Sequence, residues 1–388
     1  MKRAKRIATI PPYLFAEIDK KKQALQQRGV DIISLGIGDP DLPTPAHVVE
    51  ALHREAADPA THRYPDYEGA PEFRQAVATY YRRRFGVELD PDKEVMALIG
   101  SKEGLAHIIW AFVDPGDLVL VPDPAYPVYR THTLLAGGTP VYLPLRAENG
   151  FLPNLDEVDA EVAKRAKILF LNYPNNPTAG VATVEFFQRA VEFCRRYEIL
   201  LCHDAAYCEM TFDGYRAPSV LEVPGAMDVA VEFYSLSKPF NMTGWRIAAA
   251  VGNSEALRAL GIIKTNTDSG QFTAVQRAGI AALGDRAESF IADMNRIYRR
   301  RQDIAVAGLT KVGLAVERPA GSFYLWVPVP DGYTDSEFTS LLLEKAGVVV
   351  VPGTGYGASG AGYIRIALTI SEERLQEACD RILQTVKL

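Results

Sequence analysis

Short apolar runs alternate with amphipathic stretches from about residue 95 to about residue 285. The runs have the length of buried strands. The stretches between them carry apolar residues at helical spacing, such as Phe187, Val191 and Cys194 within Val184–Tyr197. This alternation predicts an α/β fold with a parallel sheet covered by helices. The expected strands are Val95–Ile99, Leu118–Val121, Thr139–Leu143, Lys167–Asn172, Ile199–His203, Val229–Ser235 and Trp245–Val251.

A different pattern begins at Asp285, where a long charged helix is expected from Arg286 to about Leu309. The segments after it predict a smaller α+β unit: Leu314–Val316, Ser322–Val327, Asp335–Ala346, Val348–Val351, Tyr363–Leu368 and a final helix Ser371–Val386. Residues 1 to about 44 are expected to pack with this unit. The predicted organisation is a large domain of residues 45–285 and a discontinuous small domain of residues 1–44 and 286–388.

Composition narrows the classes of protein to consider. The chain has 388 residues, 48% of them hydrophobic, and a net charge of −6, which argues against nucleic acid as the main partner. No apolar stretch approaches the length of a transmembrane helix, and no sustained apolar run follows the basic N-terminus. The cysteines show neither metal-ligand spacing nor a disulfide framework: Cys194, Cys202, Cys208 and Cys379. We therefore expect a cytoplasmic protein with buried free thiols, no metal and no membrane association.

Lys238 lies in a segment that combines two kinds of chemistry, Ser235-Leu236-Ser237-Lys238-Pro239-Phe240-Asn241-Met242-Thr243-Gly244-Trp245-Arg246. A lysine amine can form a Schiff base with an aldehyde, while Ser235, Ser237 and Arg246 can converge on a phosphate. An aldehyde and a phosphate on one small molecule describe pyridoxal 5'-phosphate (PLP). The plain alternative, a polar loop with a surface lysine, stays open on this spacing alone.

Three further segments favour the cofactor. Asp204 ends an apolar strand, and a carboxylate there can face the ring nitrogen of PLP, because a protonated ring is a stronger electron sink. Tyr207 follows at a distance of three residues, close enough to offer its phenol to the 3-hydroxyl of the ring. Asn176 follows another apolar strand, and Ser101 begins a helical run whose free N–H groups suit a phosphate. Each segment alone is typical of an ordinary loop, but together they indicate one site.

In this order and at these separations, the four segments resemble those of the class I/II aminotransferases, and the likeness covers nearly the whole chain. It implies PLP-dependent transferase fold type I, with a mostly parallel seven-stranded sheet in the large domain and a smaller α+β domain. It also implies that Lys238 holds PLP and then serves as the base for the substrate Cα proton, with Asp204 as the electrostatic partner. Asn176 and Tyr207 would share the 3-hydroxyl, and the substrates would be an amino acid and a 2-oxo acid.

Other segments are similar to the LL-diaminopimelate aminotransferases: Pro11–Phe15, Leu35–Pro40, His62–Pro65, Asp123–Tyr129 and Lys264–Gly270. This likeness implies that Tyr126 stacks on the cofactor ring and that Arg365 pairs with the substrate α-carboxylate. It predicts LL-diaminopimelate and 2-oxoglutarate as substrates, in lysine biosynthesis. Lys102 would lie at the site, where pairing with Glu103 or with the phosphate is the alternative to substrate binding. The expected substrate-binding residues are Tyr13, Gly38, Lys102, Asn176 and Arg365.

The same likeness predicts a homodimer with shared active sites. Tyr64 would reach the phosphate in the site of the neighbouring subunit. By extrapolation beyond the likeness, the Tyr67-Glu68 pair of the same turn could contact the polar far end of the substrate, although Glu68 could instead be a helix N-terminal acid favoured by the dipole. Two departures remove no catalytic group: Thr178-Ala179-Gly180 replaces a direct Thr-Gly, and Pro239-Phe240 follows the lysine where Thr-Tyr is expected. The second alters the wall beside the Schiff base and leaves the substrate open.

Other activities therefore stay open. An aspartate, alanine or aromatic aminotransferase, or a PLP β-lyase, is the near alternative on the same fold. A non-catalytic PLP-sensing regulator is the distant one, and it is disfavoured because no room for a DNA-binding domain precedes Tyr13.

Three conspicuous features are predicted to be structural or mobile elements. The glycine-rich run from Gly353 to Gly357 lacks a following helix, so a mobile flap over the site is favoured over a dinucleotide loop. His203 is expected to face away from Asp204 and to be packed or capping, because adjacent strand residues point to opposite faces. The run Arg299-Arg300-Arg301 is expected to be a solvated helix face.

Overall fold

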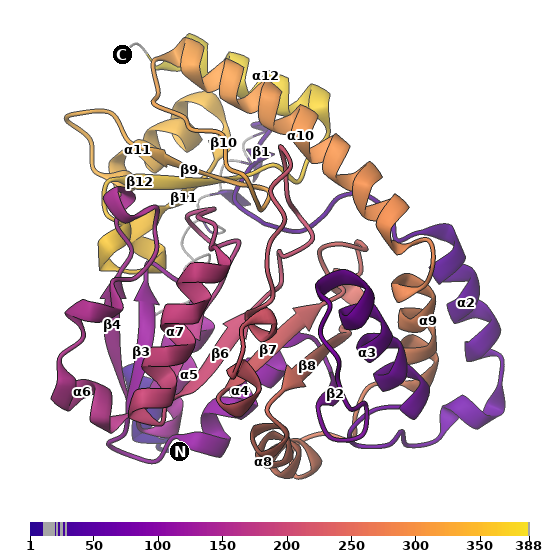
Figure 1. The fold of residues 1–388 in the computed structure, drawn as a ribbon. Helices are drawn as coiled ribbons and strands as arrows, with labels where there is room; N and C mark the ends of the chain where they lie inside the picture. Colours follow the sequence, from indigo (N-terminus) through magenta and orange to yellow (C-terminus); the bar gives the residue numbers. More distant parts are fainter. Residues whose placement is uncertain (11–19, 21, 24–25, 28, 387–388) are drawn as a thin grey trace.

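Seven strands form one sheet in the order β2, β8, β7, β6, β5, β3, β4 (Figure 1). This computed structural model describes residues 1–10, 20, 22–23, 26–27 and 29–386. Strands β4, β3, β5, β6 and β7 run parallel, whereas β8 is antiparallel to both of its neighbours, β7 and β2. The expected mostly parallel seven-stranded sheet is confirmed. The strands are Val95–Leu98 (β2), Leu118–Asp123 (β3), Thr139–Pro144 (β4), Ala166–Leu171 (β5), Leu200–Asp204 (β6), Ala230–Ser235 (β7) and Ala248–Gly252 (β8).

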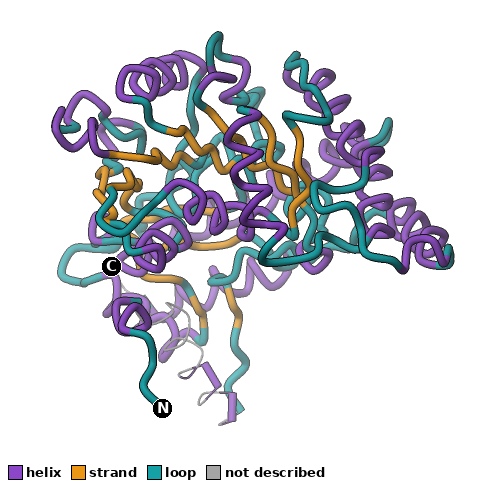
Figure 2. Tube along the Cα trace, turned by 90° about the horizontal axis from the view of Figure 1, so that it is seen from below, coloured by secondary structure: helices purple, strands orange, loops and turns teal. Residues whose placement is uncertain are grey.

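Helices cover both faces of this sheet, and the strands lie between them (Figure 2). One face packs against α4 (Ser101–Phe112), α5 (Val128–Ala136) and α8 (Ser254–Thr265). The other packs against α3 (Pro71–Phe85), α7 (Val184–Tyr197) and α9 (Thr273–Leu283), and α2 (Ala46–Ala56) packs on α9. The short helix α6 (Ala160–Arg165) leads directly into β5. Because side chains alternate along a strand, consecutive residues of β6 and β7 enter different cores.

A smaller unit lies at the carboxyl ends of the parallel strands (Figure 1). Its three-stranded antiparallel sheet has the order β11 (Val351–Pro352), β12 (Tyr363–Ala367), β9 (Tyr324–Pro328). Strand β1 (Ile33–Ser34) pairs in parallel with β10 (Val348–Val349), so an early segment of the chain joins this unit. Near the N-terminus, the 3-10 helix Lys5–Thr9 lies against α5 instead. The exact domain boundaries stay a prediction.

The helices of the smaller unit are α10 (Ala287–Val312), α11 (Asp335–Leu341) and α12 (Glu372–Thr385), and a π-helical turn, Leu342–Ala346, continues α11. The charged helix α10 packs along α12 (Figure 1). The expectation that its three arginines form a solvated face is wrong for Arg301, which is 3% exposed. The Arg301 guanidinium donates to both carboxylate oxygens of Asp41, at 2.7 and 2.8 Å, and so ties α10 to the N-terminal segment. Among the helices described, none has both the length and the apolar character that crossing a membrane requires.

Two expected strands differ from the structure. Strand β8 begins at Ala248 rather than at Trp245, because Trp245 ends a 3-10 turn and Arg246 has φ +55°. Residues 314–316 form no strand. The amide of Leu314 instead donates to the carbonyl oxygen of Leu309, so this apolar residue closes the C-terminus of α10.

Candidate active site

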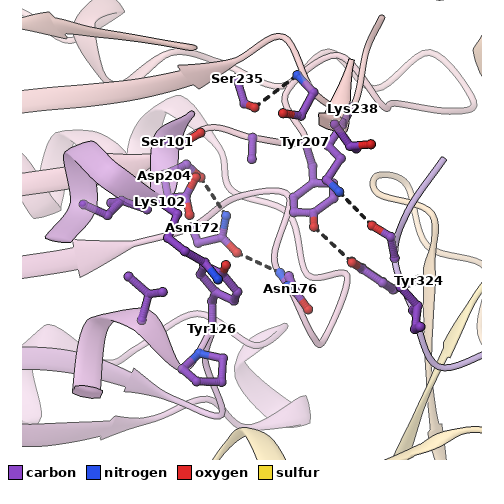
Figure 3. Close-up of a pocket in the computed structure, with 18 of the residues that line it drawn as sticks. Ser101, Lys102, Tyr126, Asn172, Asn176, Asp204, Tyr207, Ser235, Lys238 and Tyr324 are labelled. Carbon is purple, nitrogen blue, oxygen red and sulfur yellow. Dashed lines mark hydrogen bonds between the residues drawn. The ribbon is translucent and has the colours of Figure 1, made fainter. Parts of the chain in front are cut away.

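A cavity of about 650 Å³ lies between the large sheet and the smaller unit. Its walls come from the ends of β6 and β7, the start of α4, the turn after β5, and strands β9 and β12. Among the residues that line it are these expected site residues: Gly38, Ser101, Lys102, Tyr126, Asn176, Asp204, Tyr207, Ser235, Ser237, Lys238, Arg246 and Arg365. Figure 3 shows most of them around one space. The roles assigned to them stay predictions, but their assembly in one cavity is observed.

Lys238 follows β7 and projects into the cavity. Its Nζ donates a hydrogen bond of 2.7 Å to the carbonyl oxygen of Gly38 (Figure 3). Burial lowers the pKa of Lys238 to about 8, although the nearby Asp39 carboxylate opposes this shift. A lysine with this pKa is partly neutral near physiological pH, and only the neutral amine is a nucleophile or a base.

Asp204 is the last residue of β6 and is buried. The hydroxyl of Tyr129 donates to Asp204 Oδ2 at 2.8 Å, whereas Oδ1 has no hydrogen-bond partner among the described residues. Burial raises the pKa of Asp204, and the bond from Tyr129 opposes this shift. A buried carboxylate oxygen without a donor is a place for a cationic N–H from a ligand.

An anion-binding arrangement lies at the start of α4. Gly100 has φ +79° and immediately precedes the helix, whose first N–H groups have no partners within it. A Cβ atom at Gly100 would lie 2.1 Å from Nη2 of Arg246, so glycine permits the guanidinium to approach the helix start. Ser235 and Ser237 lie beside it, and the amide of Ser237 donates to Oγ of Ser235 at 3.2 Å. Hydroxyls, a guanidinium and helix N–H groups together suit a phosphate.

Arg365, on β12, forms the opposite wall and is buried. Its Nη1 donates to Oδ1 of Asn176 at 2.7 Å, and its Nη2 donates to the carbonyl oxygen of Gly36 at 2.6 Å. The guanidinium carbon lies 4.1 Å from the ring centroid of Tyr324 and 4.8 Å from that of Tyr356. These contacts fix the position of the guanidinium, and a planar cation held this way is suited to bind a carboxylate.

Four residues of the site were not expected from the sequence: Asn172, Tyr129, Tyr324 and Tyr356. Nδ2 of Asn172 donates to the carbonyl oxygen of Asp204 at 2.6 Å, and Oδ1 of Asn172 accepts from the amide of Asn176 at 2.8 Å (Figure 3). Asn172 therefore joins the ends of two strands. Its position at the end of an apolar run is the same signal that identified Asp204. Tyr129 could have been noticed three residues after Tyr126, one turn further along the chain.

The expected site residue Tyr13 lies outside the described residues. Tyr64 is 89% exposed and does not line the cavity of its own chain, and Glu68 is exposed beside it. In the Lys264–Gly270 segment, Lys264 is buried and its Nζ donates to Asp268 at 2.8 Å.

The glycine-rich run after β11 forms two short 3-10 helices, Gly353–Tyr356 and Ala358–Gly360. The amide and hydroxyl of Ser359 donate to Oδ2 of Asp123 at 3.0 and 2.9 Å. These bonds attach the run to the end of β3 and bring Tyr356 to the cavity wall. Its mobility as a flap stays a prediction.

Comparison with known proteins agrees with this geometry. Residues 30–382 match the family described as "Aminotransferase class I and II". The LL-diaminopimelate aminotransferase of Moorella thermoacetica is 58% identical over 382 residues, which cover 98% of each chain. That of Syntrophobacter fumaroxidans is 55% identical over 381 residues, again 98% of each chain.

Solved structures agree as well. Apo-BacF from Bacillus subtilis is 38% identical, with a TM-score of 0.96 over 100% of this chain and 99% of that one. A single mutant of the Thermus thermophilus aspartate aminotransferase is 31% identical, with a TM-score of 0.93 over 99% of this chain and 100% of that one. The chain belongs to the class I and II aminotransferases, enzymes that use pyridoxal phosphate.

Proposed function

We propose that the protein transfers an amino group from LL-diaminopimelate to 2-oxoglutarate with PLP, as an enzyme of lysine biosynthesis. The observation that carries this proposal is the 52–58% identity to LL-diaminopimelate aminotransferases over nearly the whole chain. The cavity supports it, because it combines an amine of lowered pKa, a buried acid and a fixed guanidinium.

The residues fit PLP at three points. The unpartnered Oδ1 of Asp204 suits the N–H of a protonated pyridine ring. Gly100, Ser237 and Arg246 leave a concave anion site at the start of α4, which suits the phosphate. Tyr207 and Asn176 also line the cavity, and they would hold the 3-hydroxyl of the cofactor. When bound, PLP supplies an aldehyde that condenses with amines and a ring that withdraws electrons from the adjoining carbon.

The chain itself contributes proton transfer and orientation. Lys238, with a pKa of about 8, would take the proton from the substrate Cα and return it to the former aldehyde carbon of the cofactor. Arg365 binds the substrate α-carboxylate and thereby presents the Cα–H bond to that amine, since its own position is fixed by Asn176 and Gly36. Asp204 keeps the ring nitrogen protonated.

Replacing the lysine tests this assignment. Lys238→Ala should abolish turnover and remove the absorbance of lysine-linked PLP, while Ser101, Ser237 and Arg246 still bind the cofactor without a covalent bond. Exposed Lys167, which lies on the sheet, is the control: Lys167→Ala should stay active. Borohydride reduction followed by peptide mapping should label Lys238, and labelling at another lysine would refute the assignment.

Substrate choice depends on the far end of LL-diaminopimelate, which carries a second ammonium and a second carboxylate. Lys102 lines the cavity, and its Nζ lies 5.6 Å from the ring centroid of Tyr126. We propose that Lys102 binds the distal carboxylate, with Tyr13 and Glu68 as further polar contacts. Lys102→Met should then lower kcat/KM for LL-diaminopimelate at least tenfold more than for alanine, the loss of one charge-assisted hydrogen bond.

Comparing kcat/KM for LL-diaminopimelate, aspartate, alanine, glutamate and phenylalanine decides the substrate. LL-diaminopimelate should be preferred, and its meso isomer should be used poorly, because the wrong isomer leaves polar groups of the site unsatisfied. If aspartate or alanine is preferred, the substrate proposal is wrong and the aminotransferase assignment stands.

We further propose a homodimer with shared sites, in which Tyr64 of each chain reaches the phosphate of the other. Two features of the single chain support this. Arg246 and Lys102 are exposed although they line the cavity, and Tyr64 is 89% exposed outside it. Mixing the inactive variants Lys238→Ala and Tyr64→Phe should restore part of the activity in the mixed dimer. A fully active monomer in solution would contradict the proposal.

The proposed cytoplasmic location is supported by the thiols. All four cysteines are free and buried in the described chain. Free thiols are usual where the compartment is reducing.

A further inference from the structure

Tyr324, the first residue of β9, contacts two parts of the active site from a buried position. Its hydroxyl oxygen lies 3.0 Å from that of Tyr207 (Figure 3). Its ring lies under the guanidinium of Arg365, with 4.1 Å between the guanidinium carbon and the ring centroid. Tyr324 therefore touches both the phenol expected to face the cofactor and the arginine expected to face the substrate.

Gly38 leaves room for the hydroxyl of Tyr324 because it has no side chain. A Cβ atom at Gly38 would lie 1.8 Å from the hydroxyl oxygen of Tyr324, so any side chain there would displace that hydroxyl. The carbonyl oxygen of Gly38 also accepts the hydrogen bond from Lys238. The absence of a side chain at Gly38 thus permits the Tyr324 hydroxyl to reach Tyr207 directly beside the lysine.

The direction of the hydrogen bond between the two hydroxyls follows from counting protons. Each phenol has one hydrogen to donate. If Tyr207 donates its hydrogen to the 3-oxygen of the cofactor, then Tyr324 must donate to Tyr207. A hydrogen bond received by Tyr207 makes it a stronger donor, because successive hydrogen bonds polarise one another.

We propose that Tyr324 is a positioning residue with two separable parts: its hydroxyl strengthens the hydrogen bond from Tyr207 to the cofactor, and its ring holds Arg365 for the substrate carboxylate. This inference rests on the proposed PLP-dependent function. It does not depend on which amino acid is the substrate, because every amino acid carries the α-carboxylate.

Two substitutions separate the two parts. Tyr324→Phe removes the hydroxyl and keeps the ring, so the Arg365 contact survives. The anionic 3-oxygen then loses some stabilisation, and the absorbance of the substrate-free holoenzyme should change with pH at a midpoint about 0.5 unit higher than in the wild type, roughly a threefold change in the equilibrium. KM for the amino acid should stay within about twofold, since the cation–π contact is intact.

Tyr324→Leu removes both parts. It should show the same displacement of the spectral midpoint and, in addition, a KM for the amino acid about tenfold higher, the loss of one desolvated cation–π contact. Tyr356→Leu is the matched control, because the Tyr356 ring also contacts the guanidinium of Arg365. It should raise KM and leave the spectral midpoint unchanged.

A double-mutant cycle shows whether Tyr324 acts through Tyr207. In a Tyr207→Phe background, Tyr324→Phe should cause no further displacement of the midpoint. An additive displacement, or a midpoint that Tyr324→Phe does not move at all, overturns the role of the hydroxyl. Equal KM values for Tyr324→Phe and Tyr324→Leu overturn the role of the ring. The substrate proposal fails on a different measurement, the ranking of amino acids by kcat/KM.

Discussion

His203 and Asp204 are neighbours on strand β6, yet they meet opposite surroundings on the two faces of the sheet. Nδ1 of His203 lies 2.7 Å from Oε2 of Glu232, and Nε2 lies 3.2 Å from the carbonyl oxygen of Tyr173. Both ring nitrogens therefore lie within hydrogen-bond distance of an oxygen. Glu232 also accepts from the hydroxyl of Tyr81 at 2.7 Å. On the other face, one buried oxygen of Asp204 has no partner within the part of the chain that the structure describes.

The difference separates structure from function. A buried polar group whose hydrogen bonds are complete stabilises the fold, whereas one left incomplete costs stability unless a ligand completes it. The His203–Glu232 pair belongs to the first kind. Asp204 belongs to the second, and it lines the cavity. His203 was predicted to be packed, and that prediction is confirmed.

The largest effect is expected for the His203–Glu232 pair. His203→Leu leaves the buried Glu232 carboxylate without its imidazole partner and should lower the free energy of unfolding by about 3–5 kcal/mol. Urea unfolding of the cofactor-free protein measures this. The double variant His203→Leu, Glu232→Leu should recover much of the loss, because no charge is then left unpaired. A double variant less stable than His203→Leu would contradict the comparison.

The same pair has a pH dependence. Burial raises the pKa of Glu232, but the bonds from His203, Tyr81 and Ser219 outweigh burial and hold it below the ordinary value of 4.5. The stabilisation is therefore complete above about pH 4.5 and is lost as the pH falls through the lower, folded-state pKa. The difference in the free energy of unfolding between wild type and the double variant should shrink in that acidic range.

Asp204→Asn tests the carboxylate whose hydrogen bonds are incomplete. It should lower kcat by about 10²–10³-fold, the loss of one preorganised electrostatic partner. The cofactor-free variant should be at least as stable as the wild type at pH 7. Because burial raises the pKa of Asp204 above its ordinary 3.8, ionisation costs stability as the pH rises above that value, and asparagine removes the cost. A large loss of stability at pH 7 would place Asp204 with His203 among the structural groups.

The lowered pKa of Lys238 can be tested kinetically. Only the neutral amine attacks an aldehyde, and burial brings the pKa of Lys238 to about 8 from 10.5. The rate at which cofactor-free protein acquires the absorbance of lysine-linked PLP should therefore rise with pH around a midpoint near 8. A rate that keeps rising toward pH 10 would show that the amine is not desolvated.

The smallest effect concerns Ala179, in the turn that carries Asn176. Ala179 has φ +59°, a left-handed conformation that glycine adopts more easily. Ala179→Gly should raise the free energy of unfolding by about 0.5 kcal/mol, the relieved strain less the added chain entropy. Ala361, exposed with φ −56°, is the control, and glycine there should lower stability by a similar amount.

Much of the fold could be predicted because buried parallel strands are continuous apolar runs. Every expected strand of the large sheet is present, with ends that differ by a few residues. The errors have local causes. Arg246 adopts a left-handed conformation that delays β8, and Leu314 serves a helix end rather than a strand. Arg301 was misplaced because its partner Asp41 is distant in sequence, so no local pattern reveals the ion pair.

The site could be predicted where its residues stand in motifs and not where they act through tertiary contacts. Lys238, Asp204 and Asn176 follow strands, and the ends of parallel strands meet at one edge of a sheet. Tyr324 begins an apolar strand of the smaller unit, so in the sequence it looks like one more buried aromatic residue. Its approach to Tyr207 depends on how the two units meet, which no local spacing encodes.

The reversal of strand β8 has a consequence for how this site can change. Ser235 and Ala248 face each other at the ends of β7 and β8, so the turn between them returns the chain to the edge it left. Lys238 and Arg246 both lie in this turn, and a parallel β8 would have needed a crossover connection in its place. Lys238 and Arg246, the residues proposed to hold the cofactor, therefore depend on the same connection between two strands. An insertion or deletion in the turn displaces both at once, and transplanting either into another scaffold requires the whole hairpin of β7 and β8.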